Sequence, residues 1–258
     1  MRPRDGSGRD PAALGRLFFG LGLLGFAVEN VLFGHYVLAR ATPWPSPPLY
    51  QLLFACVTGA LLGAAGLSIL TGRWTRELGL EAWFLILAVS LSLHWPKTIT
   101  GDPFSGDWTN ALKAIVFATG GLLAAAAAPG PPSALLGLLR TIAPHACAPF
   151  FLLAGIQHIL FVGFVQTLIP PFIPGARFWT YFAAGALLAA GFGLLVPPVR
   201  RLAAICAGWM VFSWVFLVHL PLAYGRAEEW KGVVEALAIS GVCFLIAASA
   251  DRPDPVDR

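Results

Sequence analysis

Residues 27–33, Ala27-Val28-Glu29-Asn30-Val31-Leu32-Phe33, return 128 positions later as Gly155-Ile156-Gln157-His158-Ile159-Leu160-Phe161. Further matches follow at slightly shorter offsets: His94-Trp95-Pro96 with His219-Leu220-Pro221, Trp108 with Trp230, and Lys113 with Glu235. The offset falls from 128 to 122 in polar or proline-rich stretches, as expected when loops absorb changes of length that packed helices cannot. The chain is therefore predicted to be a duplication.

The repeated unit has the composition of a membrane protein. Apolar residues make up 57% of the chain, charged residues only 12%, and the mean hydropathy is +0.75. A soluble domain carries about twice that charged fraction. Eight apolar stretches are mostly long enough to cross a bilayer, which takes about 20 residues: 14–38, 49–71, 79–96, 108–128, 144–169, 178–197, 202–221 and 230–249.

Four spans per copy is an even number, so both copies enter the membrane in the same sense. We therefore expect an all-α integral membrane protein whose eight transmembrane helices form two parallel, pseudo-symmetric four-helix bundles. The expected units are a tail, a first repeat, a linker, a second repeat and a second tail: 1–12, 13–128, 129–143, 144–250 and 251–258.

Positive charge predicts how the chain is oriented. With a cytoplasmic N-terminus, eleven Lys and Arg residues fall on the cytoplasmic side and six on the other. Cationic loops resist translocation, so we expect both termini in the cytoplasm. The first apolar run lacks a small-residue cleavage site, so we expect the N-terminus to be retained. The net charge of +4 then reflects topology and contact with the lipid bilayer, and no continuous basic face for nucleic acid is expected.

Ionisable groups inside a membrane are costly, so the few present define a candidate polar pocket in the outer half of the spans. With the aromatic residues that border it, the expected set is Glu29, His94, Trp108, Lys113, Gln157, His158, His219, Trp230 and Glu235.

Two interpretations of this pocket remain open. In the first, Glu29 pairs with Lys113 in one copy, while a hydrogen bond or a protonated carboxyl takes that place in the other, so the polar groups only tie helix one to helix four. In the second, Glu235 lacks a cation at the matching position and carries a proton that His158 and His219 share. That cluster would suit a flat, amphipathic molecule such as a quinone head group, although interfacial Trp residues often serve only as anchors.

No other cofactor is identifiable from the sequence. Ligation of haem by His94 and His219 would require both rings to face one cofactor, and duplication already explains their matched depth, so haem is disfavoured. The four cysteines lie singly in expected helices, which argues against a thiol-disulfide or zinc centre, and no metal ligand set is expected.

The second copy resembles the DoxX family of four-helix membrane proteins over residues 150–249. The resemblance lies in Gly155-Ile156-Gln157-His158, the proline-rich stretch 170–175, Gly191-Phe192-Gly193, Arg200-Arg201 and His219-Leu220-Pro221. The first copy is less similar, since Glu29-Asn30 replaces Gln157-His158. The resemblance implies a bacterial inner-membrane protein, some relatives of which serve redox complexes such as thiosulfate:quinone oxidoreductase, with Gln157 and His158 as the polar pair of the motif.

Three functions follow as hypotheses. The first is a membrane subunit of a quinone-linked redox system, with partner subunits, in which Glu235 and His158 bind or protonate the quinone. The second is a carrier for a small solute or lipid. The third is an assembly scaffold without a ligand of its own. The sequence leaves open whether the chain is an enzyme.

Overall fold

The computed structural model describes residues 10–43, 46–102, 104–131 and 133–250, and this part of the chain is helical without strands. Eight segments are long and apolar enough to cross a membrane: Pro11–Phe33, Pro48–Thr71, Thr75–Thr100, Gly106–Ala127, Ala134–Leu160, Ala176–Leu195, Pro197–Ala223 and Ala227–Ser249. The prediction of eight long apolar helices is therefore confirmed. Both predicted tails fall largely outside the described residues.

The long helices of the first repeat are α1 (Pro11–Phe33), α2 (Pro48–Thr71), α3 (Thr75–Leu93) and α5 (Gly106–Ala127). Those of the second are α6 (Ala134–Leu160), α8 (Ala176–Leu195), α9 (Pro197–Trp214) and α11 (Trp230–Ser249). Short turns join them: η1 (Leu38–Arg40), α4 (Trp95–Thr100), α7 (Val162–Val165), η2 (Gln166–Leu168), η3 (Val215–His219), α10 (Leu220–Ala223) and η4 (Ala227–Glu229).

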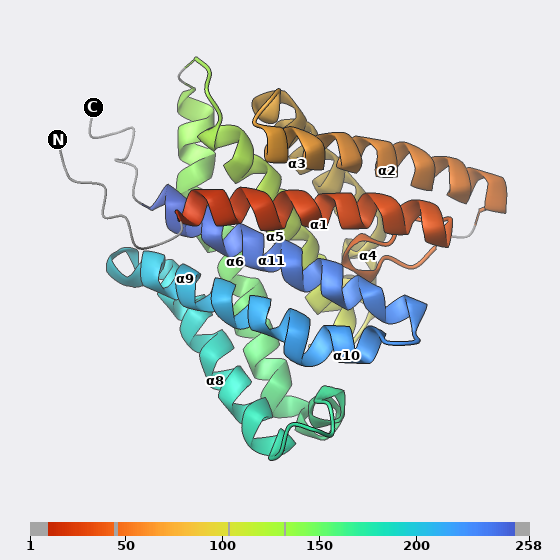
Figure 1. The fold of residues 1–258 in the computed structure, drawn as a ribbon, viewed down its shortest axis with the longest axis vertical. Helices are drawn as coiled ribbons and strands as arrows, with labels where there is room; N and C mark the ends of the chain where they lie inside the picture. Colours follow the sequence, from red (N-terminus) through yellow and green to blue (C-terminus); the bar gives the residue numbers. More distant parts are fainter. Residues whose placement is uncertain (1–9, 44–45, 103, 132, 251–258) are drawn as a thin grey trace.

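The two repeats are interleaved (Figure 1). The first helix of repeat one, α1, packs extensively against α2 and against α11, the last helix of repeat two. In the same way α6 packs against α8 and against α5, the last helix of repeat one. The last helices, α5 and α11, also contact each other. Each repeat therefore completes its packing with a helix of the other.

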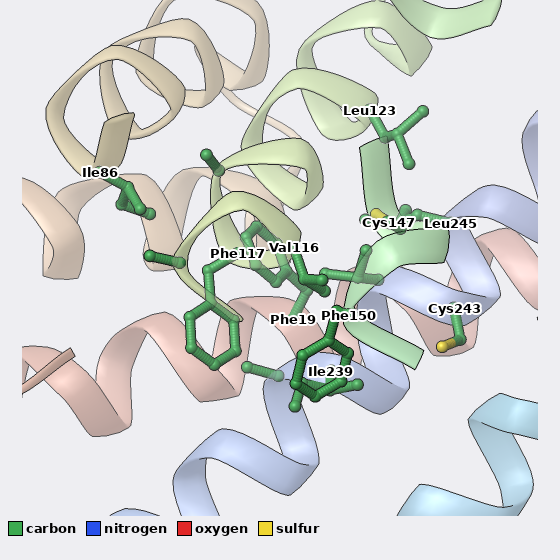
Figure 2. Close-up of a cluster of buried hydrophobic side chains, with 14 of the residues drawn as sticks. Phe19, Ile86, Val116, Phe117, Leu123, Cys147, Phe150, Ile239, Cys243 and Leu245 are labelled. Atoms are coloured by element: carbon green, nitrogen blue, oxygen red, sulfur yellow. The ribbon is translucent and has the colours of Figure 1, made fainter. Parts of the chain in front are cut away.

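The shared core lies where these helices meet. Figure 2 shows Phe19 of α1, Phe117 of α5, Phe150 of α6 and Ile239 of α11 within one apolar cluster. Glycine lets α1 and α11 approach closely, because a Cβ at Gly241 would collide with the backbone of Phe19. Small residues at helix contacts are expected where lipid provides no hydrophobic drive for association.

Two boundaries differ from the expected ones. α1 ends at Phe33, because Gly34 adopts a left-handed conformation (φ 67°) and donates its N–H to the carbonyl of Val31. The apolar run up to residue 38 had hidden this stop. α6 begins at Ala134 and carries Pro144 and Pro149 inside it, so most of the expected linker 129–143 is helical.

Candidate functional site

The chain folds back into the bundle after Gly34. We call residues 34–41 the return segment. Tyr36, Val37, Leu38, Ala39 and Ala41 are all buried, and η1 within the segment contacts α5 and α11. The return segment brings Arg40 back toward the polar residues of the bundle.

Polar contacts hold the return segment in place. Asn30, which is fully buried, accepts a hydrogen bond from the N–H of Val37 at 3.0 Å and donates to the hydroxyl of Thr58 at 3.0 Å. The His94 ring interacts with the backbone of Leu38. These contacts satisfy backbone groups that a buried loop would otherwise leave unpaired.

The return segment also contains unfavourable backbone geometry. Ala39 and Arg40 adopt consecutive left-handed conformations, with φ 54° and 55°. A left-handed residue other than glycine costs about 1–2 kcal/mol, so the surrounding contacts must hold this conformation.

The charged centre of the site joins the two repeats. The Nζ of Lys113 in α5 lies 2.8 Å from Oε2 of Glu235 in α11, and both side chains are more than nine-tenths buried. The Nε of Arg40 lies 3.4 Å from the same oxygen, with the Arg40 side chain 43% exposed. Glu235 therefore has two cationic partners, and its second oxygen accepts no hydrogen bond from the described residues.

This arrangement corrects the expectations for Lys113 and Glu235. Lys113 pairs with Glu235 of the other repeat, where the sequence had suggested Glu29 of its own. Glu235 has cations beside it, so it does not match the isolated, proton-carrying carboxyl that was expected. The prediction paired the fourth long helix of each repeat with the first helix of the same repeat. In the fold, the two fourth helices, α5 and α11, contact each other.

Glu29 is a buried acid without a hydrogen-bond partner among the described residues. Its relative exposure is 5%, and neither carboxyl oxygen accepts a hydrogen bond from a described residue. The charged groups close enough to act on it are Glu235, Lys231, Arg40 and Glu228. Lys231 is itself engaged, since its Nζ lies 2.5 Å from Glu228 and 4.3 Å from the centre of the Phe33 ring.

The two matched histidines, His94 and His219, lie near the charged centre on different structural elements. His94 is buried at the junction of α3 and α4, and its Nε2 has no hydrogen-bond partner among the described residues. His219 ends the π-helical turn η3, which contacts α11. A Cβ at Gly232, one turn before Glu235, would collide with the His219 ring, so that ring lies directly against α11. Short π-helical turns such as η3 often occur at functional sites.

Gln157 and His158 belong to a separate group of contacts. Gln157 accepts from the hydroxyl of Thr109 at 2.6 Å and donates to the carbonyls of Phe104 and Ser105, which fastens α6 to the start of α5. His158 bonds its own helix through Nδ1 and the carbonyl of Ala154, at 2.7 Å. Its ring stacks on Trp214 of α9. The expected proton-sharing cluster of Glu235, His158 and His219 is therefore not hydrogen-bonded in the structure.

The bordering tryptophans, Trp108 and Trp230, lie in the first turns of α5 and α11. Trp108 is partly buried and packs edge-on against Trp95, while Trp230 is 48% exposed at the start of α11. A small cleft opens beside the return segment, lined by His35, Tyr36, Thr42, Pro43, Gln51 and Leu93. Burial raises the pKa of the Tyr36 hydroxyl, which has no hydrogen-bond partner in the described residues.

Some participants were missed at the sequence level. Asn30 was quoted only as part of the repeat, and Arg40 was not among the predicted site residues. The left-handed Gly34 after an apolar helix was the available signal that the chain turns at this point. The described residues contain no cluster of three or more His, Cys, Asp or Glu side chains that could hold a metal ion.

Comparison with known proteins covers only the second repeat. Residues 147–248 match a family described as a domain of unknown function, DUF8561. The matched stretch runs from within α6 to the last turn of α11, so it coincides with the four long helices of repeat two. Neither the curated proteins nor the solved structures that were searched include a match.

Proposed function

We propose that this protein is a proton-exchanging membrane subunit of a redox system, and that Glu29 is the residue that takes up and releases the proton. The observation that carries the proposal is the Glu29 carboxyl, which is buried without a hydrogen-bond donor beside an acid that already has two cations. An unpaired carboxylate in such surroundings is strongly disfavoured, whereas the protonated carboxyl is tolerated. Ionisable groups within membrane spans commonly mark proton pathways.

The redox assignment rests on the resemblance of the second repeat to the DoxX family. Reduction of a quinone consumes protons together with electrons. A partner subunit would supply the electrons, and Glu29 would supply or receive a proton. In this proposal the chain lies in the bacterial inner membrane with both termini in the cytoplasm, so the Arg40 end of the bundle faces outward.

Infrared difference spectroscopy of the purified protein tests the proton site. As the pH is raised, wild-type protein should lose the carbonyl stretch of a protonated carboxyl, and Glu29→Gln should lack that change. Glu235→Gln and Glu81→Gln are the controls. Glu235 has cationic partners, and Glu81 is the other acid whose two oxygens have no hydrogen-bond partner among the described residues. Persistence of the full signal in Glu29→Gln would refute the proposal.

Co-purified quinone tests the redox part separately. Quinone extracted from wild-type protein in mild detergent should exceed that from Glu29→Gln at equal protein amounts. A protein that exchanges the proton but never carries quinone would favour the carrier hypothesis. If substitutions at Glu29, Lys113 and Glu235 lowered only the amount of protein, a scaffold would be the better assignment.

A further inference from the structure

We propose that Arg40 is a switch residue that leaves Glu235 for Glu29 when Glu29 loses its proton, and that this movement releases the return segment from the bundle. The inference rests on the proposed function, because it assigns the regulation of the same proton site. It makes residues 34–41 a gate whose position reports the protonation state of Glu29.

The distribution of charge favours such an exchange. Glu235 has two cations, Lys113 and Arg40, while neither oxygen of Glu29 has a hydrogen-bond partner in the described part of the chain. With Glu29 protonated, both cations share one acid. With Glu29 ionised, one cation for each acid becomes the favourable arrangement, because an opposite charge stabilises a buried carboxylate.

Arg40 is the cation that can move. Its contact with Glu235 is the longer one, at 3.4 Å against 2.8 Å for Lys113, and its side chain is 43% exposed against 9%. Detaching a partly solvated guanidinium costs less than detaching a buried ammonium, which would be left in apolar surroundings. Arg40 also lies close enough to act electrostatically on Glu29.

The backbone of the return segment favours release. Ala39 and Arg40 remain left-handed only while their surroundings hold them, and the Arg40 contact is part of that restraint. Once Arg40 moves, this strain can relax, and the hydrogen bond from Val37 to Asn30 is the next restraint to break.

Four charged groups among the described residues act electrostatically on Glu29. Glu235 and Lys231 lie on α11, Arg40 on the return segment and Glu228 on η4. Lys231 is the rival partner for ionised Glu29, but it is bonded to Glu228. The experiment must therefore separate Arg40 from Lys231.

Cysteine labelling measures the opening. Val37→Cys places a thiol at a position that is 1% exposed, in a protein whose exposed Cys56 and Cys206 are replaced by Ala. The labelling rate with a membrane-impermeant maleimide is divided by that of Tyr224→Cys in the same background, a position that is 91% exposed. This ratio removes the ordinary effect of pH on thiol reactivity. Ala41→Cys, at a position 6% exposed, is the second reporter if Val37→Cys does not fold.

The ratio should rise about tenfold from mildly acidic to mildly alkaline pH, which corresponds to a loss of about 1.4 kcal/mol of restraint when Arg40 leaves Glu235. Glu29→Gln should keep the ratio low at every pH, and Arg40→Gln should make it high and independent of pH. Lys231→Gln should leave the rise intact. A ratio that stays flat in the parent protein, a rise that survives Glu29→Gln, or a rise abolished by Lys231→Gln would overturn the switch.

The two proposals fail in different ways. If the infrared signal of Glu29 is present and the labelling ratio is flat, Glu29 exchanges a proton without a gate. If the infrared signal is missing, both proposals are wrong.

Discussion

Lys113 and Glu235 occupy corresponding positions in the two repeats and form an ion pair across the interface between them, with Nζ and Oε2 2.8 Å apart. Identical residues at these positions would place two like charges together in a poorly solvated environment, which is unfavourable. Duplication within one chain removes that restriction, because each copy can carry its own residue. The two repeats therefore differ at this position, and the difference allows the ion pair that joins them.

Breaking this pair should destabilise the protein more than removing it entirely. Lys113→Met leaves the carboxylate of Glu235 with only Arg40, and should lower the free energy of unfolding by about 3–5 kcal/mol. Adding Glu235→Met should recover much of the loss, since Arg40 can reach solvent. Denaturation in detergent measures both. Equal losses in the single and double variants would show that the carboxylate left behind by Lys113→Met is not itself destabilising.

Exchanging the two charges should restore stability only in part. In the variant with Lys113→Glu and Glu235→Lys the new lysine lies beside Arg40, so one attraction in the native protein becomes a repulsion. Its melting temperature should fall between those of wild type and Lys113→Met. Adding Arg40→Gln to the exchanged protein should raise it, and a decrease would contradict the observed geometry.

The backbone of the return segment offers a stabilising substitution. Ala39→Gly should stabilise the closed structure by about 1 kcal/mol, because glycine adopts the left-handed conformation without the Cβ clash. Ala41, with φ −56°, has no such strain, and Ala41→Gly should be destabilising. Thermal unfolding of the two variants gives the comparison, and the same sign of change in both would argue against strain at residue 39.

Asn30 should control the mobility of the return segment. Asn30→Leu leaves the N–H of Val37 without its partner and should cost about 1–3 kcal/mol. Hydrogen exchange should then increase over residues 35–41. Thr58→Val is the control, because it removes only the partner of the Asn30 amide group and leaves the bond to Val37. Protection that stays unchanged in Asn30→Leu would mean that other contacts hold the segment.

The close approach of α1 and α11 should tolerate no side chain at Gly241. Gly241→Ala places a Cβ against the backbone of Phe19, so α1 and α11 must separate and stability should fall by about 1–3 kcal/mol. A Cβ at Gly185 has no heavy atom within 4 Å, so Gly185→Ala should be nearly neutral or slightly stabilising. Unfolding curves of the two variants, compared with wild type, distinguish these outcomes.

The sequence alone determined the eight apolar helices and the list of scarce polar residues. Those properties depend on composition and spacing within single segments: an apolar stretch of sufficient length becomes a helix because its backbone can satisfy its hydrogen bonds internally. The tertiary structure decided which of those residues meet. Lys113 pairs with Glu235 because α5 and α11 pack together across the repeats. Arg40 contacts Glu235 because the chain turns back into the bundle at Gly34. Pairing of this kind depends on contacts between helices distant in sequence, which the apolar pattern of each helix does not specify.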